Sequence, residues 1–156
     1  MHTTINKILF ILFFLNAALL ARDINIDSIV KDSIKSNKHV FVFLHRTDCG
    51  YCESMLSFTL DDDAVKELIK NDFTYVHINI NDDDFVTYKE FKGSGHDFAK
   101  HIGYNFYPSS IFIDNKNEII YAIPGYQEED KFLKILNYIN SGAYKTVKYK
   151  NYKYNR

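Results

Sequence analysis

Residues 39–52, HVFVFLHRTDCGYC, join an apolar run to a C-x-x-C pair that contains the only two cysteines of the 156-residue chain, Cys49 and Cys52. The run 39–44 is rich in β-branched and aromatic residues, which predicts a fully buried strand. A cysteine pair at the mouth of a helix suits thiol–disulfide exchange, because the helix N-terminus stabilises a thiolate. The stretch therefore predicts a redox pair placed directly after a central strand.

Two other roles for the cysteine pair fit less well. A bond between cysteines three positions apart closes almost no loop, so it would stabilise the fold little. A structural zinc site wants four ligands, and the chain offers only two thiols. Redox chemistry is therefore favoured over a structural disulfide, and no metal site is predicted.

The N-terminus has the pattern of a secretory signal peptide. Lys7 precedes an apolar run over 8–20 that only Asn16 interrupts, and the small residues Ala17, Ala18 and Ala21 follow or end it. The run is shorter than the roughly 20 residues of a membrane-spanning helix. We expect cleavage near Ala18 or Ala21 and a periplasmic location.

The chain left after cleavage has about 135 residues, which suits one domain with a core of its own. The predicted organisation is a signal peptide over 1–21, a domain over 22–143 and a basic tail over 144–156. The formal net charge of −1 indicates no general affinity for nucleic acid.

Hydrophobic periodicity gives the order of elements along the rest of the domain. In chain order we predict a helix capped by Asp27, the strand 39–44, helical segments over 49–60 and 63–69, a strand over 73–80, a polar inserted loop over 81–95 with a short strand or turn near 85–91, a short helix over 97–102, a hairpin of 110–114 with 118–123, and a helix over 128–139. The order is βαβ followed by ββα.

This order resembles the thioredoxin fold, an α/β architecture with a central mixed β-sheet flanked by helices. The resemblance covers roughly 26–139 and is carried by FLHRTDCGYCESM (43–55), FKGSGHDFAKHIGYNFYPSSIFID (91–114) and IPGYQEEDKFLKILNYINSGAY (123–144). Within the superfamily, the chain looks most like exported bacterial thioredoxin-like proteins such as the sulfur-oxidation-associated thioredoxins.

The resemblance implies roles for the residues around the cysteine pair. Cys49 would attack a partner disulfide and Cys52 would resolve the mixed disulfide, while Gly50 and Tyr51 would tune the reduction potential. Pro108 matches the family's cis-proline, which faces the cysteines. Tyr107, directly before it, would line the substrate groove; an ordinary core aromatic is the alternative for this residue.

The chain departs from many thioredoxins on both sides of the first cysteine. Asp48 replaces a tryptophan, and its charge beside Cys49 should oppose thiolate formation. His45 and Arg46 would offset that charge, although the favoured interpretation of His45 is a packed or solvated structural histidine and that of Arg46 is a surface residue.

A second departure concerns proton transfer at the resolving cysteine. Phe43 stands where many thioredoxins bury an aspartate that assists this transfer. Cys52 therefore needs another proton acceptor, for which water, Glu53 and His45 are the candidates.

The resemblance implies an exported thiol:disulfide oxidoreductase that acts on protein disulfides without a bound cofactor or a stable metal. We favour a reductase supplied by a membrane electron donor. The Gly-Tyr dipeptide also occurs in periplasmic disulfide isomerases, so an oxidant or isomerase is one alternative. A Cu(I)-binding module that uses the two cysteines with His45 or Met55 is another, because Cu(I) prefers soft thiolates.

The tail over 144–156 is basic and rich in tyrosine. It has no acidic residue and carries four tyrosines together with Lys145, Lys148, Lys150, Lys153 and Arg156. Contact with anionic lipid or an acidic partner is one interpretation. A frayed, solvated terminus is the favoured one.

Overall fold

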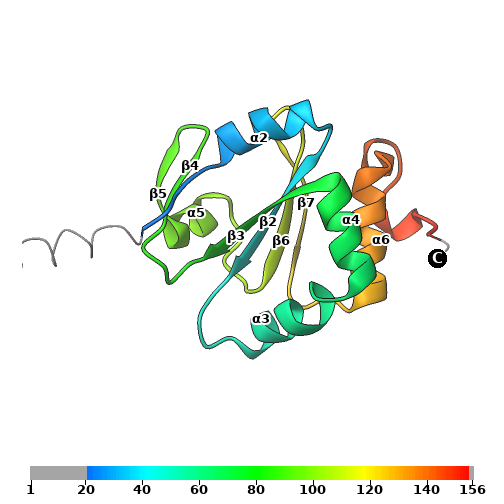
Figure 1. Cartoon of the computed structure of the whole chain (residues 1–156), viewed down its shortest axis with the longest axis horizontal. Helices are drawn as coiled ribbons and strands as arrows, with labels where there is room; N and C mark the ends of the chain where they lie inside the picture. The colour runs from blue at the N-terminus through cyan, green and yellow to red at the C-terminus, as the bar shows by residue number, and fades with distance from the viewer. Residues whose placement is uncertain (1–20, 155–156) are drawn as a thin grey trace, which may run out of the picture.

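A four-stranded mixed sheet runs through the middle of the computed structural model, which describes residues 21–154 (Figure 1). Its strands are β2 (His39–His45), β3 (Phe73–Asn79), β6 (Ser109–Ile113) and β7 (Ile119–Pro124), in the order β3-β2-β6-β7. β2 and β3 are parallel, whereas β6 and β7 are antiparallel to their neighbours. The predicted strand, helix, strand order and the later hairpin are confirmed.

Helices cover both faces of this sheet. Helix α2 (Ile26–Lys35) lies on one side, and α4 (Asp63–Asp72) packs beside α6 (Glu129–Asn140) on the other, at the right of Figure 1. Strand β2 is buried on both faces, because Val40, Val42 and Leu44 belong to one core cluster and Phe41 and Phe43 to the other. The continuous apolar run thus behaves as a central strand.

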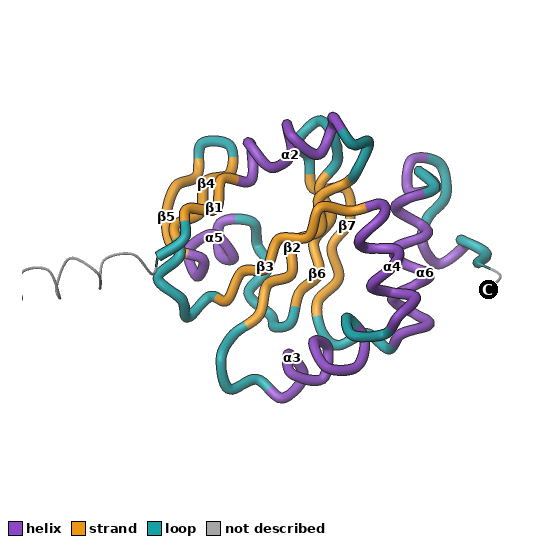
Figure 2. Tube along the Cα trace, viewed as in Figure 1, coloured by secondary structure: helices purple, strands orange, loops and turns teal. Residues whose placement is uncertain are grey.

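The segment predicted as an inserted loop folds into part of a second sheet. Strands β4 (Phe85–Tyr88) and β5 (Phe91–Ser94) form a hairpin, and β1 (Asp23–Asn25) pairs in parallel with β4. The short helix α5 (Gly95–His101) follows. This sheet lies beside α2 and apart from the central sheet (Figure 2). Strand β1 pairs with residues 62 positions further along the chain, which local sequence patterns do not reveal.

The helical stretch after the cysteines is divided in two. Helix α3 (Gly50–Ser54) continues into a π-helical turn over Met55–Thr59, so the predicted regular helix over 49–60 holds only for its first part. The wide turn places Thr59 where its hydroxyl donates to the Gln127 carbonyl oxygen at 2.5 Å. Asp62 then caps α4, since its Oδ1 accepts from the Ala64 and Val65 N–H groups at 3.0 Å each.

The predicted capping role of Asp27 is wrong. Asn25 caps α2 instead, with its Oδ1 accepting from the Ser28 N–H at 2.9 Å. The Asp27 carboxylate, two residues further along in the first turn, accepts from the Lys89 N–H at 2.9 and 3.0 Å and from Asn117 Nδ2 at 2.6 Å. It therefore joins α2 to the β4–β5 turn and the β6–β7 turn, a contact that spans 90 positions.

Replacing Asp27 by alanine is expected to lower the free energy of unfolding by about 1–2 kcal/mol, because three hydrogen bonds to a charged acceptor are lost. Asp32→Ala on the same helix is the control, since the Asp32 carboxylate makes an exposed ion pair with Lys35 and its removal should change stability much less. Urea unfolding of both variants makes the comparison. Equal effects would show that Asp27 is an ordinary surface carboxylate.

The C-terminal tail is not a frayed, solvated terminus. Its four tyrosines pack against the core cluster that α4, α6 and the sheet enclose; they are Tyr144, Tyr149, Tyr152 and Tyr154. The Tyr138 hydroxyl donates to the Val147 carbonyl oxygen at 2.6 Å, and the Tyr138 and Tyr152 rings lie 5.2 Å apart. Burial of these aromatic rings therefore holds the tail against the core. The composition of the tail did not show where the rings would pack.

The predicted signal peptide falls almost wholly outside the described residues. Its apolar run, Ala17 and Ala18 all precede residue 21, and Ala21 is the first residue that the structure describes. Across 21–154, no helix is long and apolar enough to cross a membrane.

Candidate active site

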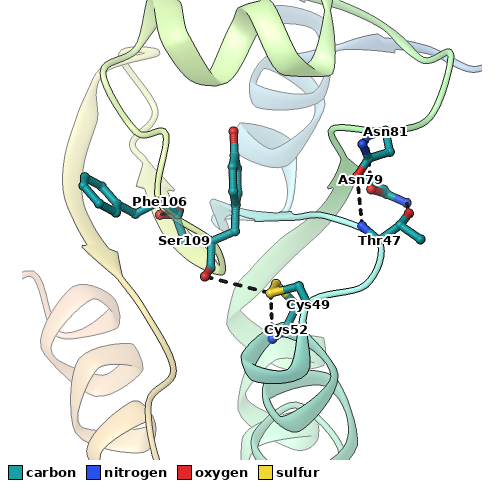
Figure 3. Close-up of a disulfide and its surroundings, with 8 residues drawn as sticks. Thr47, Cys49, Cys52, Asn79, Asn81, Phe106 and Ser109 are labelled. Atoms are coloured by element: carbon teal, nitrogen blue, oxygen red, sulfur yellow. Dashed lines mark hydrogen bonds between the residues drawn. A yellow bond between two sulfur atoms is a disulfide. The ribbon is translucent and has the colours of Figure 1, made fainter.

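Cys49 and Cys52 form a disulfide at the start of α3 (Figure 3). Cys49 is the N-cap residue, and its Sγ accepts from the Cys52 N–H at 3.2 Å. The Cys49 side chain retains 8% of its exposure, whereas Cys52 retains 1%. The geometry therefore makes Cys49 the more accessible sulfur and Cys52 the deeper one, while their roles in exchange stay a prediction.

Pro108 lies opposite the disulfide. The Tyr107–Pro108 peptide bond is cis, as predicted, and the Tyr107 carbonyl oxygen lies 4.0 Å from Cys49 Sγ. The Ser109 hydroxyl donates to the Phe106 carbonyl oxygen at 2.6 Å and so fixes the turn that leads into β6. Two segments 58 positions apart in sequence thus form one site.

A depression of about 350 Å³ opens beside Cys49. The residues that line it come from both segments: Arg46, Asp48, Cys49, Gly50, Tyr51, Asn105, Phe106 and Tyr107. Tyr51 is 71% exposed and Phe106 is 70% exposed, which is unusual for large apolar side chains. Sequence reasoning identified Tyr51 and missed Phe106, for which proximity to the proline was the available signal.

Tyr107 combines the two roles considered for it. It lines the depression and also packs partly against the core cluster on the α2 side of the sheet. Burial raises the pKa of Tyr107, and the positive charge of Arg46 acts in the opposite direction.

Asp48 and Gly50 flank the nucleophile with different backbone demands. Asp48 has a φ of 54°, in the left-handed region that a non-glycine residue seldom adopts, and its side chain is exposed. A Cβ at Gly50 would meet no atom within 4 Å, so the fold does not require glycine at that position. Their influence on the reduction potential stays a prediction.

Two asparagines that sequence reasoning missed hold the loop before Cys49. Asn81 Oδ1 accepts from the Thr47 N–H at 3.0 Å, and Asn79 Nδ2 donates to Thr47 Oγ1 at 3.1 Å. Both lie at the end of β3, on the opposite side of the disulfide from Phe106 and Ser109 (Figure 3). Because β2 and β3 are parallel, their carboxyl ends meet at one edge, which was the usable signal.

His45 is a buried, packed residue. Its ring stacks on His77 of β3 with centroids 4.3 Å apart, and on Phe43 at 5.5 Å. The Nε2 atoms of both histidines are buried without a hydrogen-bond partner. Burial lowers the pKa of His45 and of His77, since desolvation disfavours the charged rings. The role of His45 as proton acceptor for Cys52 stays a prediction.

The histidine stack should make the fold less stable in mild acid. Both pKa values are depressed in the folded state, so the unfolded chain takes up protons first as the pH falls below about 6.5. We expect the urea midpoint to be lower at pH 5 than at pH 7.5, and the drop to shrink in His45→Phe/His77→Phe. Half-buried His39, whose pKa desolvation also lowers, retains part of the slope.

Exposed His96 provides the control for this pH experiment. His96→Gln should leave the dependence of the midpoint on pH as in the unsubstituted chain. An unchanged pH dependence in the double phenylalanine variant would show that the stack does not govern acid stability.

A comparison with known protein families shows to which family the chain belongs. The model of the thioredoxin-like domain family matches residues 26–140, which include the cysteine pair, the cis-proline and the closing helix α6. The chain belongs to the thioredoxin-like domain family. The thioredoxin-like fold that the sequence predicts is therefore confirmed.

Solved structures show the same fold. The chain is 27% identical to a thioredoxin-fold protein from Helicobacter pylori, covering 72% of this chain and 74% of that one, with a TM-score of 0.62. For a thioredoxin from Thermus thermophilus the identity is 20%, the coverage 78% and 88%, and the TM-score 0.60. For the oxidised C-terminal domain of DsbD from Neisseria meningitidis they are 16%, 77% and 99%, and 0.54.

No curated protein sequence is significantly similar to this chain. For metals, residues 21–154 contain no group of three or more histidine, cysteine, aspartate or glutamate side chains arranged to hold an ion. When reduced, Cys49 and Cys52 would offer two soft ligands, and the described part of the chain adds no further cluster to them. The arrangement suits electron-pair exchange between sulfurs.

Proposed function

We propose that this protein is an exported thiol:disulfide oxidoreductase that reduces protein disulfides, of the kind found among exported thioredoxin-like proteins. The observation that carries the proposal is the Cys49–Cys52 pair at an open groove, with the Tyr107 carbonyl oxygen 4.0 Å from the more accessible sulfur. Membership of the thioredoxin-like family supports it.

The reaction follows from the two sulfurs. In the reduced protein, the Cys49 thiolate attacks one sulfur of a substrate disulfide and displaces the other as a thiolate. The Cys52 thiolate then attacks Cys49 Sγ, which releases the second substrate sulfur and leaves the Cys49–Cys52 disulfide. Two electrons pass to the substrate, whose thiolates take up protons. The Cys52 N–H, 3.2 Å from Cys49 Sγ, is placed to stabilise the charge on Cys49.

The direction of electron flow and the electron donor are parts of the proposal. A membrane donor would return two electrons to the Cys49–Cys52 disulfide after each turnover. The C-terminal domain of DsbD, whose fold this chain shares, has been solved in oxidised and reduced forms, which supports a two-state dithiol site. Export is proposed from the N-terminal signal pattern.

Turnover of a disulfide-bonded peptide tests the proposal. The protein, reduced beforehand and freed of reductant, should release two peptide thiols per molecule and become oxidised itself. Net oxidation of a dithiol peptide by the disulfide form, with no reduction in the reverse assay, would instead favour an oxidant or isomerase. Stoichiometric Cu(I) uptake without any exchange would favour the copper-binding alternative.

The exposed aromatics of the groove should favour peptide substrates. Phe106→Ser and Tyr51→Ser are each expected to lower kcat/KM for a disulfide peptide with apolar flanking residues about fivefold, because roughly 1 kcal/mol of apolar burial is lost. The rate with a small aromatic disulfide, which does not fill the groove, should change less than twofold. Phe85→Ser is the control, because Phe85 is 47% exposed on β4, outside the groove.

An equal loss in all three variants, or no loss in Phe106→Ser and Tyr51→Ser, would mean that the groove does not bind the peptide. Progress curves recorded at several peptide concentrations separate this effect on KM from any effect on the exchange step.

A further inference from the structure

The backbone and the side chain of Arg22, the residue directly before β1, both contact the buried carboxylate of Asp84. Asp84 is 3% exposed, and its Oδ1 accepts from the Arg22 backbone N–H at 3.1 Å and from Arg22 Nε at 3.2 Å. Arg22 Nη2 pairs with Asp84 Oδ2 and also donates to the His77 carbonyl oxygen at 3.3 Å. One carboxylate thus receives both the backbone and the side chain of one residue.

Arg22 is also the point at which the chain becomes part of the sheet. Its carbonyl oxygen accepts from the Phe85 N–H at 2.9 Å, and the parallel register of β1 with β4 begins with the next residue, Asp23 opposite Phe85. Ala21, immediately before it, is exposed. The Arg22 backbone therefore contacts both the Asp84 carboxylate and the neighbouring strand β4.

We propose that the Ala21–Arg22 peptide bond is the processing site, and that the α-amino group released on Arg22 forms an ion pair with Asp84. The inference rests on the proposed export of the chain. Hydrolysis adds one water across the bond, which leaves a carboxylate on Ala21 of the departing peptide and an ammonium on Arg22. The nitrogen that is hydrogen-bonded to Asp84 Oδ1 then carries a full positive charge.

The charges around Arg22 favour an N-terminus at Arg22 over one at Leu19. Before cleavage, the guanidinium of Arg22 is the cation facing Asp84, while Asp82 adds a second negative charge that also raises the pKa of Arg22. The α-ammonium would be a second cation, 3.1 Å from Asp84 Oδ1, beside these two negative charges. Hydrogen bonds between ionised groups are roughly twice as strong as neutral ones. After cleavage at Ala18, Leu19, Leu20 and Ala21 would still precede Arg22, so the Arg22 nitrogen would remain a neutral amide.

The first test is the N-terminus of the exported protein. The full chain is expressed in a bacterium, recovered from the periplasm, and examined by intact mass and N-terminal sequencing. We expect one species that begins at Arg22. A species that begins at Leu19 would overturn this inference and leave export standing, whereas an unprocessed chain retained in the cell would overturn the proposed export.

The second test measures the ion pair itself. Two chains that begin at Arg22, one with a free and one with an acetylated α-amino group, are compared by urea unfolding, alone and with Asp84→Asn. Acetylation should lower the folding equilibrium constant about tenfold in the Asp84 chain, the size expected for a hydrogen bond between charged groups. It should have almost no effect in the Asp84→Asn chain, and Asp82→Asn should retain most of the effect.

If Asp84→Asn does not fold, the reactivity of the α-amino group is measured instead of the combined effect of acetylation and Asp84→Asn. With Asp84, Asp82, the Arg22 guanidinium and His77 around it, the ammonium should be acylated at pH 8 about tenfold more slowly in the folded chain than in urea. Equal rates in the two states, or an acetylation effect of the same size with and without Asp84, would overturn the pair.

Discussion

Replacing Cys49 by serine is expected to reduce disulfide exchange to the uncatalysed rate. The Cys49 sulfur borders the groove and is the more exposed of the pair, so no other thiol in the chain can begin the reaction. A serine hydroxyl does not form the thiolate on which exchange depends. Peptide turnover by the reduced variant, followed by thiol release, measures the effect.

Cys52→Ser should differ from Cys49→Ser in kind. Its Cys49 thiolate can still attack, but the resolving sulfur, 1% exposed and one turn further along α3, is missing. We expect a mixed disulfide between Cys49 and the peptide that persists on a non-reducing gel and disappears with dithiothreitol. Ser57→Ala, an exposed change in the following turn, should turn over normally. A trapped adduct on Cys49→Ser instead would reverse the two assigned roles.

Phe112→Ala should cause the largest loss of stability. Phe112 on β6 is fully buried; its ring stacks on Phe41 at 5.1 Å and also meets Phe73 and Phe132. Removing a buried aromatic ring loses its transfer free energy and leaves a cavity, which together cost about 3–5 kcal/mol. Urea unfolding, followed by far-ultraviolet circular dichroism, measures the free energy.

Phe58→Ala is the matched control for this substitution. Phe58 lies on the π-helical turn and is 61% exposed, so its removal should change the free energy of unfolding by less than about 0.5 kcal/mol. A loss below about 1 kcal/mol for Phe112→Ala would show that the packing around β6 does not hold the central sheet together as described.

The sequence allowed good prediction where a local pattern had one structural outcome. The run 39–44 alternates between two core clusters because both faces of β2 are covered, and continuous apolar sequence is the mark of such a strand. The helical segment predicted over 63–69 lies within α4, which extends over Asp63–Asp72. The cysteine pair followed from its spacing at the mouth of a helix, whereas the cis-proline followed from the family resemblance rather than from local physics.

Errors arose where long-range partners decided the outcome. Asp27 has the sequence position of a cap, yet its carboxylate accepts hydrogen bonds from Lys89 and Asn117, which lie in turns distant in sequence. The tail appeared solvated because lysines alternate with its tyrosines, and only the surface of α6 and β7 shows where the rings pack. Phe106 became part of the site through the approach of two loops, and its position two residues before Pro108 was the only signal of this in the sequence.

The reduction potential of the Cys49–Cys52 pair tests the central claim most directly. The chain that begins at Arg22 is equilibrated in glutathione and dithiothreitol buffers of graded ratio, and its free thiols are quantified. The account predicts a reversible two-electron transition below about −220 mV, in the range of reducing thioredoxins. A value above about −150 mV would contradict the reductase direction, and a pair that exchanges at no ratio would contradict thiol–disulfide exchange itself.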